Sequence, residues 1–342
     1  MDKGLREAVE FKSAALRHLA SFPFREAWWL PSAHLQTVWP VMFRPAPEPP
    51  MKHHRIQTPD DDFLDLHVQR GQPELPTVLL LHGLEGNAQS KYNLGLQSKL
   101  GALGWTVVTM EFRSCGAEMN RAPRMYHLGE TSDLDFVVSW LIEEHSATRV
   151  FVTGVSLGGN VVLKWLGERG ATLPAQVIAA AAICPPYNLI TSGPYMDSAF
   201  MTPYRRWFLK TLIAKAVEKD RQYPGRMDIE KVRRAKTFAE FDTHATAALH
   251  GFRDAEDYWR RSSCHQFLSE IQRPTLLISS EDDPFNPKET IPVDTCESSP
   301  WLIPQFTRRG GHVGFVSIDE TGQTAFWAED QVIRFFQFCH AC

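Results

Sequence analysis

Short apolar runs alternate with helical segments between residues 77 and 183. Four runs carry almost only apolar or β-branched side chains, namely Thr77–Leu81, Trp105–Met110, Val150–Thr153 and Gln176–Ile183. Segments with helical spacing lie between them, at Lys91–Leu103 and Thr131–Glu144. Strands that are buried on both faces lack the polar–apolar alternation of half-exposed strands. The pattern therefore predicts a parallel sheet with helices on both faces.

The pattern on either side of this region adds further elements. A helix is expected around Leu5–Leu19, before an aromatic-rich stretch from Phe22 to Phe43. Residues 53–69 alternate on both sides of an acidic turn at Asp60–Asp62, which is typical of a hairpin. We expect this hairpin to form two edge strands. Buried strands resume late in the chain, at Pro274–Ser279 and Trp301–Phe306.

The alternation stops between Cys184 and Arg273, which indicates an insertion between two strands. Its helical patches include Tyr204, Phe208 and Leu212, which recur every four residues and so share one face. We expect that face to shape a pocket above the sheet, and a purely structural cap is the alternative. The chain then divides into an N-terminal helical and aromatic strap (1–50), a core (51–185 and 264–342) and a helical lid (186–263).

Composition narrows the class of protein. The 342 residues are 43% hydrophobic and carry a net charge of −4 without a dense Lys/Arg stretch, which argues against nucleic-acid binding. The apolar stretch Val177–Cys184 is too short to span a membrane, and the charged start Met1–Glu7 does not resemble a signal peptide. Six scattered cysteines indicate a reducing compartment, so we expect a cytoplasmic protein. Cys339 and Cys342 are expected in a frayed tail, and no motif predicts a metal or another cofactor.

The most informative motif is Gly154-Val-Ser156-Leu-Gly158, which joins the run Val150–Thr153 to a helical segment at Val161–Leu166. A strand can turn into a helix within one residue only if the positions two before and two after carry no side chain. The residue at the tip is then exposed, and the amides that begin the helix face any negative charge that develops there. Ser156 is therefore the candidate nucleophile of a nucleophile elbow. An ordinary Gly-Ser loop is the alternative.

A serine nucleophile needs an imidazole to take its proton and a carboxylate to orient that imidazole. The run from Pro274 is followed by Asp282 and Asp283, and the run from Trp301 is followed by Gly310-Gly-His312. His312 follows Asp283 by 29 residues, which leaves room for one helix and one strand between two adjacent sheet loops. We expect His312 to be the base. Neighbouring side chains point to opposite sides, so only one aspartate should face it, and this parity does not say which.

An oxyanion hole is expected at the turn His82-Gly83-Leu84-Glu85-Gly86, which follows the first long buried strand. Gly83 allows the turn to fold over the sheet edge, so that the backbone N–H of Leu84 can point toward Ser156. The second donor should be the N–H of Leu157, because that residue begins the helix after the nucleophile. His82 precedes the serine in the chain and is interpreted as structural.

Taken in order, these motifs resemble the α/β-hydrolase superfamily. They are His-Gly-x-x-Gly at residue 82, Gly-x-Ser-x-Gly at 154, Asp-Asp-Pro-Phe at 282 and Gly-Gly-His at 310. Further stretches are similar to the AB-hydrolase-4, or YheT-like, group of esterases, namely Ser32–Thr37, Phe112–Gly116 with Asn120–Arg124, Tyr126–Thr131, and Phe241–Thr246 with Gly251-Phe252. The resemblance covers about residues 20–335. It implies an α/β-hydrolase fold in which Asp283 is the acid of a triad with Ser156 and His312.

The resemblance also implies a function. A serine carboxylic-ester hydrolase would act through an acyl-enzyme on a small or medium-chain acyl ester or a lipid, without a cofactor. The first alternative is acyl transfer to an alcohol by the same triad, and the second is a non-catalytic lipid-binding protein. Relatives in eukaryotes often carry an N-terminal membrane anchor; none is expected here, which leaves a peripheral membrane contact open.

Two further groups of residues each allow two interpretations. Arg113, Arg121, Arg124 and His127 follow the run that ends at Met110. They either bind an anionic part of a substrate or hold their loop through nearby carboxylates, and we favour the structural role. The aromatic residues from Trp28 to Phe43 either face lipid or pack on the sheet and its helices, and packing is the default.

Overall fold

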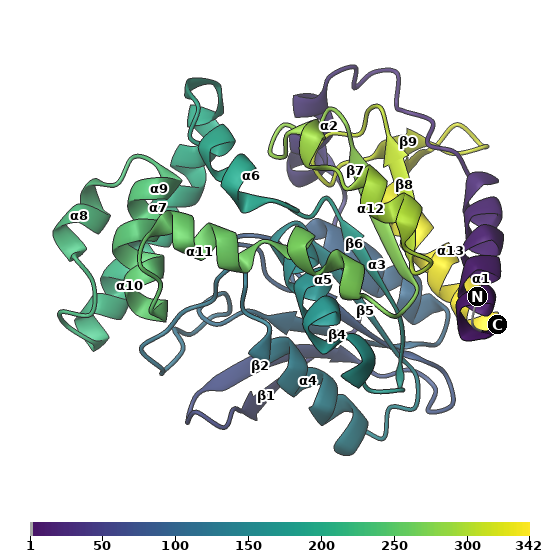
Figure 1. Cartoon of the computed structure of the whole chain (residues 1–342), viewed down its shortest axis with the longest axis horizontal. Helices are drawn as coiled ribbons and strands as arrows, with labels where there is room; N and C mark the ends of the chain where they lie inside the picture. Colours follow the sequence, from purple (N-terminus) through teal and green to yellow (C-terminus); the bar gives the residue numbers. More distant parts are fainter. Residues whose placement is uncertain (1–2) are drawn as a thin grey trace.

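An eight-stranded sheet forms the centre of the molecule in a computed structural model, which describes residues 3–342 (Figure 1). The strands are β1 (Lys52–Gln57), β2 (Phe63–Gln69), β3 (Thr77–Leu81), β4 (Thr106–Glu111), β5 (Val150–Val155), β6 (Val177–Ile183), β7 (Thr275–Ser280) and β8 (Leu302–Thr307). Their order is β1-β2-β4-β3-β5-β6-β7-β8, and all neighbours from β4 to β8 are parallel. The predicted mostly parallel sheet is therefore confirmed.

The hairpin before β3 was predicted correctly, but its place in the sheet was not. β1 and β2 pair antiparallel, and β2 also pairs antiparallel with β4. Of these two strands only β1 lies at an edge of the sheet, so the expectation of two edge strands was wrong for β2. The reason is visible in its burial, because β2 begins with Phe63, Leu64, Asp65 and Leu66, all of which are buried.

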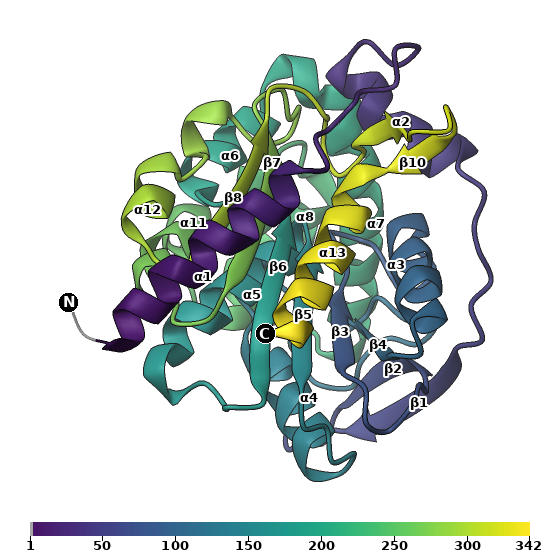
Figure 2. The ribbon, with the colours of Figure 1, turned by 90° about the vertical axis from the view of Figure 1, so that its right-hand side faces the viewer.

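Helices cover both faces of the sheet. The helices α4 (Ser132–Glu143) and α5 (Leu157–Arg169) pack on one face, against strand residues such as Leu79 and Val152. The helices α1 (Lys3–Ala20), α3 (Lys91–Ala102) and α13 (Trp327–Ala341) cover the other face, against residues such as Leu80 and Phe151 (Figure 2). Because successive strand side chains point to opposite faces, the continuous apolar runs supply both cores.

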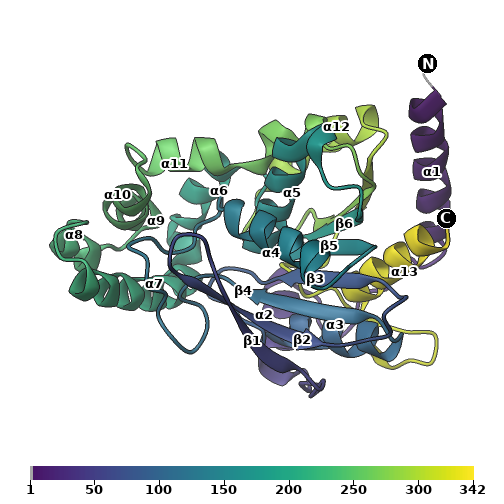
Figure 3. The same cartoon turned by 90° about the horizontal axis from the view of Figure 1, so that it is seen from below.

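The residues between β6 and β7 form a group of helices at one end of the molecule, away from α1 and α13 (Figures 1 and 3). These elements are α6 (Leu189–Met196), η2 (Ala199–Met201), α7 (Thr202–Gln222), α8 (Ile229–Arg234), α9 (Phe238–Phe241), the π-helical η3 (Asp242–Thr246), α10 (Ala247–His250) and α11 (Ala255–Ser262). They have a small core of their own, which includes Phe208, Leu212 and Val232. Residues 186–263 are called the insert below. The turn η4 (Cys264–Glu270) leads back to β7.

Several elements were not predicted. They are α2 (Ala33–Phe43), the small hairpin of β9 (Val316–Ile318) and β10 (Thr324–Phe326), α13, and the short turns η1 (Gly170–Thr172) and η5 (Lys288–Thr290). The helix for which the spacing of Asp283 and His312 left room is α12 (Val293–Ser298). The expectation of a frayed tail was wrong for Cys339. It lies within α13 and is buried, because α13 packs Phe335, Phe336 and Cys339 onto the sheet. Among residues 3–342, no helix combines the length and the apolar character needed to cross a membrane.

The aromatic stretch around α2 combines packing and exposure. The rings of Trp29 and Trp39 pack 4.9 Å apart beside the buried Leu30. Trp28 and Phe43 are 78% and 62% exposed. Packing is therefore confirmed for part of this stretch, and a lipid contact of the exposed part stays a prediction.

Candidate active site

Ser156 lies at a one-residue turn between β5 and α5. Its backbone has φ 53° and ψ −117°, a conformation that is strained for a residue with a side chain. The turn has no room for side chains at the flanking glycines. A Cβ atom on Gly158 would lie 2.6 Å from the carbonyl oxygen of Leu81, and one on Gly154 would lie 2.5 Å from the nitrogen of Gly159. The two glycines of the motif are thus sterically required.

Three side chains from three loops form a hydrogen-bonded line. Nε2 of His312 lies 2.9 Å from Oγ of Ser156, and Nδ1 of His312 lies 2.8 Å from Oδ2 of Asp283. These residues follow β5, β7 and β8, whose carboxyl ends meet at the same edge of the sheet. The tautomer that fits has the proton on Nδ1, which donates to Asp283 and leaves Nε2 free to accept from the serine hydroxyl.

The two neighbouring aspartates face different partners. Oδ1 of Asp283 accepts from the amides of Phe285 and Asn286, at 2.7 and 3.2 Å. Nδ2 of Asn286 donates to its other oxygen, Oδ2, at 3.2 Å. Oδ1 of Asp282 accepts from the amide of Gly311 at 3.0 Å instead. The structure thus turns Asp283 toward the imidazole and Asp282 toward the backbone of the following loop.

Helix α2 holds the loop that carries the histidine. Oγ1 of Thr37 accepts from the amide of His312 at 2.8 Å. The side-chain amide of Gln36 makes two hydrogen bonds with the backbone of Val316. Its Oε1 accepts from the amide nitrogen at 2.7 Å, and its Nε2 donates to the carbonyl oxygen at 3.2 Å. A Cβ atom on Gly311 would lie 2.8 Å from Oγ1 of Thr37, so the contact requires glycine there. Gln36 and Thr37 were not predicted as site residues, and the resemblance of the stretch Ser32–Thr37 was their only signal.

The expected oxyanion turn lies beside the serine. A Cβ atom on Gly83 would lie 3.3 Å from Cβ of Ser156, and both Leu84 and Leu157 line the same cavity as Ser156. Within residues 3–342, the Leu84 amide donates to no backbone or side-chain acceptor. An unpaired amide next to the nucleophile is what an oxyanion requires.

His82 is part of the scaffold of this turn. Its Nδ1 lies 2.7 Å from the carbonyl oxygen of Gly83, and its Nε2 accepts from the amide of Phe112 at 3.1 Å. Burial lowers the pKa of His82 to about 4, so the ring is neutral at physiological pH. Its two ring nitrogens join the turn to the end of β4, which is the structural role predicted.

A cavity of about 100 Å³ opens at Ser156, between the sheet edge and the insert. Its lining is mostly apolar and includes, from the insert, Leu189, Met196, Phe208, Phe238 and Trp259. Of the predicted apolar face, only Phe208 reaches the cavity. Leu212 packs in the core of the insert, and the hydroxyl of Tyr204 lies 2.9 Å from Nδ1 of His34 in α2.

One carboxyl group also lines this cavity. Oδ2 of Asp242 accepts from Nε1 of Trp259 and Oδ1 accepts from the hydroxyl of Thr246, both at 2.8 Å. Burial raises the pKa of Asp242 to about 7, because these two hydrogen bonds offset only part of the desolvation. Asp242 begins the π-helical turn η3, a rare backbone form that often occurs at functional sites.

Asp242→Asn should remove a pH-dependent loss of stability. The ordinary pKa of this group is 3.8, so between about pH 4 and pH 7 the unfolded chain is ionised while the folded protein keeps its proton. The free energy of unfolding of the wild type therefore decreases as the pH rises through this window. Asparagine can bond to both Trp259 and Thr246 and does not ionise. We expect the difference in Tm, variant minus wild type, to increase as the pH rises from 5 to 8. A difference in Tm that stays constant over this range would contradict the prediction.

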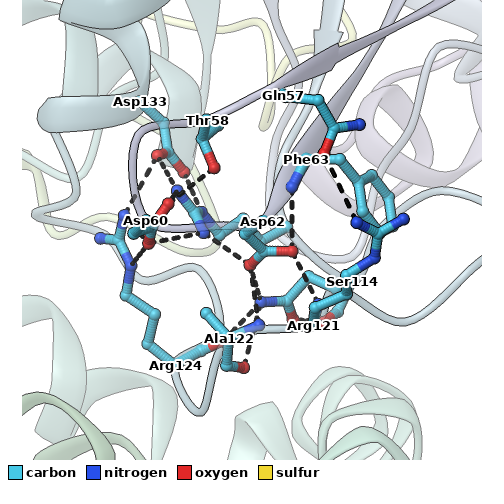
Figure 4. Close-up of polar contacts among 12 residues, drawn as sticks. Gln57, Thr58, Asp60, Asp62, Phe63, Ser114, Arg121, Ala122, Arg124 and Asp133 are labelled. Carbon is cyan, nitrogen blue, oxygen red and sulfur yellow. Dashed lines mark hydrogen bonds and ion pairs between the residues drawn. The ribbon is translucent and has the colours of Figure 1, made fainter.

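Carboxylates bind the side chains of two arginines after β4, Arg113 and Arg124, whereas the side chain of Arg121 reaches Gln57 (Figure 4). Arg113 donates to both oxygens of Asp133, at 2.7 and 2.8 Å, and to Asp62 at 2.6 Å. Arg124 reaches Asp133 at 3.4 Å, and the backbone amide of Arg121 donates to Asp62 at 2.7 Å. The side chain of Arg113 is only 1% exposed. The structural role favoured from the sequence is confirmed for Arg113 and Arg124.

Cys184 lies next to the hydrogen-bonded line. Among the described residues, three side chains could offer a metal ion one ligand atom each, namely Cys184, Asp283 and His312. These three atoms lie within 4.8 Å of one another, a spacing that suits a metal ion. Burial, together with the nearby charge of Asp283, holds the pKa of the Cys184 thiol well above its ordinary value. A metal requires the thiolate, and Asp283 and His312 already bond each other. These side chains therefore fit a metal poorly.

Comparison with known proteins identifies a family and several similar chains. The chain matches the family described as alpha/beta hydrolase fold over residues 76–320. It is 37% identical over 291 residues to "Putative esterase YheT" of Escherichia coli (strain K12). The aligned region covers 83% of this chain and 84% of that protein. It is 30% identical over 242 residues to phospholipase ABHD3 of Mus musculus. The aligned region covers 70% of this chain and 58% of that protein. The chain thus spans less than two thirds of the mouse relative.

A solved structure gives the same result for the fold. The esterase Pf2001 of Pyrococcus furiosus superposes with a TM-score of 0.55 over 84% of this chain and 90% of that chain. The two sequences are 17% identical, so the likeness concerns the fold.

Proposed function

The chain belongs to the α/β-hydrolase family, within its YheT-like AB-hydrolase-4 group, and from this membership we propose that it is a serine carboxylic-ester hydrolase. The observation that carries the proposal is the line from Ser156 through His312 to Asp283, which opens into an apolar cavity. Such a line activates a hydroxyl group, and an apolar cavity beside it suits the acyl part of an ester.

In the proposed reaction, Oγ of Ser156 attacks the ester carbonyl carbon while Nε2 of His312 takes its proton. The bond from Nδ1 to Asp283 keeps the imidazole in the required tautomer and stabilises its charged form. The amides of Leu84 and Leu157 donate to the oxyanion of the tetrahedral intermediate. His312 then protonates the leaving alcohol. Water attacks the acyl-enzyme in the second half, with His312 again as the base, and the carboxylic acid is released.

The cavity and the relatives support the proposed substrate class. The lining from the insert is mostly apolar, which favours a small or medium acyl chain. One relative is named a phospholipase and another an esterase, which supports an ester or lipid substrate. A cytoplasmic location is part of the proposal, and the six free cysteines are in keeping with a reducing compartment.

Acyl transfer is the second candidate, because an alcohol in place of water would use the same residues. Hydrolysis of p-nitrophenyl esters with acyl chains of increasing length tests the proposal, with and without added ethanol. Free acid as the product supports a hydrolase, and ethyl ester as the main product supports a transferase. No turnover of any ester and no fluorophosphonate labelling would favour a non-catalytic lipid-binding protein.

Phe208→Leu should change the preference for acyl chain length. Phe208 lines the cavity, so a smaller side chain makes room for a longer acyl chain. We expect the preferred chain length to increase, while kcat/KM for a short acetate ester changes little. Trp207→Leu is the matched control, because the neighbouring Trp207 is 58% exposed and should leave the preference unchanged. An equal loss for all chain lengths in Phe208→Leu would mean that this part of the insert only supports the fold.

A further inference from the structure

A lysine of the insert reaches across to the oxyanion turn. Nζ of Lys215, in α7, lies 2.7 Å from Oε1 of Glu85, the residue directly after Leu84. The side chain of Glu85 is 4% exposed and that of Lys215 is 21% exposed, so most of this ion pair is out of water. It joins two segments that are 130 residues apart in the chain.

The turn is held on both sides of the Leu84 amide. The amide of Gly83 donates to the hydroxyl of Tyr92 at 2.9 Å, and the amide of Glu85 donates to the hydroxyl of Tyr126 at 3.0 Å. Tyr126 in turn donates to Oε1 of Glu85 at 2.6 Å, the same oxygen that accepts from Lys215. Glu85 therefore connects the backbone of the turn, through its side chain, to the insert.

Glu85 also has a strained backbone, with φ +55°. Strain of this kind persists only where surrounding contacts hold it. Without Lys215, the buried carboxylate would keep Tyr126 as its one donor among the described residues, and an unpaired buried charge is strongly unfavourable. The carboxylate would then turn toward solvent, and the turn would relax with it. The Leu84 amide would move, although an oxyanion donor must be held within about 0.5 Å to act.

Resting on the proposed function, we propose that Lys215 and Glu85 are positioning residues that hold the Leu84 amide in place for the oxyanion. The insert then has a second role besides lining the cavity. Lys215 of α7 then supports the oxyanion hole, so the rate of acylation depends on its contact with Glu85 and not on the docking of α7 in general. Leu84 itself adds to this coupling, because its side chain packs against the core of the insert.

The chain offers a matched control one helical turn along. Lys219 of α7 is fully buried, and its Nζ donates to the carbonyl oxygens of Asn120 and Ala122 at 2.7 and 2.9 Å. It anchors the same helix to the core but does not touch the oxyanion turn. Lys215→Met and Lys219→Met therefore both remove an anchor of α7, and only the first removes the partner of Glu85.

The test measures kcat and KM for a short acetate ester, per active site titrated with a fluorophosphonate, together with Tm. We expect Lys215→Met to lose roughly 10- to 100-fold in kcat with little change in KM, because a misplaced oxyanion donor weakens the transition state alone. Lys215→Arg should recover most of the loss, since it keeps a charged donor for Glu85. Lys219→Met should lower Tm and leave kcat close to that of the wild type.

Two results would overturn the inference. Unchanged kcat in Lys215→Met would mean that the ion pair does not position the turn, and an equal loss in Lys219→Met would mean that only the general docking of α7 matters. If Lys215→Met does not fold, Glu85→Gln removes the charge from the core side, and the same fall in kcat with unchanged KM is expected. Absence of labelling in the wild type would instead refute the proposed function, so the two failures are distinguishable.

Discussion

Ser156→Ala should lose about 10⁶-fold in kcat for ester hydrolysis, the largest effect expected from one substitution in this chain. Without Oγ no acyl-enzyme can form, and only the rate enhancement from the oxyanion hole and from binding is left. Steady-state hydrolysis of a short acetate ester measures the loss. Mass spectrometry after treatment with a fluorophosphonate should detect one adduct on the wild type, at Ser156, and none on the variant.

The variant should fold like the wild type. Alanine keeps the Cβ atom, so the strain at φ 53° is unchanged, and the one hydrogen bond lost is that to Nε2 of His312. An equal Tm therefore checks that the loss is chemical. Turnover by Ser156→Ala at the wild-type rate would rule out a serine hydrolase, and labelling at another residue would identify a different nucleophile.

The strands were predictable because their signal is local. A strand buried on both faces is a continuous apolar run, and β3, β5 and β6 were found for this reason. The place of β2 was not predictable in this way, because an alternating strand can pair on one side or on both. Helix α2 was missed since Pro40 and the surrounding aromatic residues obscure a helical pattern, and only the long-range contact with the histidine loop shows why the helix is there.

The residues of the site also divide into those with a local sequence signal and those without one. Ser156, Asp283 and His312 each lie in a short motif that follows a strand, so the motifs alone place them at one sheet edge, and the family resemblance distinguishes Asp283 from Asp282. Thr37 and Lys215 have no such motif. They act through contacts with residues 275 and 130 positions away, which no local pattern encodes. Asp242 lay within a stretch that the resemblance singled out, but its raised pKa follows from its burial in the folded protein, which no local pattern encodes.

Asp283→Asn should lose about 10⁴-fold in kcat, the second largest effect expected. In the wild type, Oδ1 accepts from two backbone amides and Oδ2 faces Nδ1 of His312. The asparagine oxygen would stay with the amides, because they can only donate, so its NH₂ group would face Nδ1. Nδ1 must then accept, which forces the imidazole proton onto Nε2. A protonated Nε2 cannot take the proton of Ser156, so the base is lost. The hydrogen bond from Nδ2 of Asn286 to Oδ2 is lost as well, because an NH₂ group cannot accept it.

Asp282→Asn is the matched control for this mechanism. Its Oδ1 accepts from the amide of Gly311, and the oxygen of an asparagine can accept the same hydrogen bond. We therefore expect its kcat to lie within a few-fold of the wild type. The two variants remove the same charge at adjacent positions near the histidine, so a general electrostatic effect would lower both rates alike. Equal losses would support that explanation, and a larger loss in Asp282→Asn would refute the assignment of Asp283. Only a large loss confined to Asp283→Asn requires that this carboxylate sets the tautomer of His312.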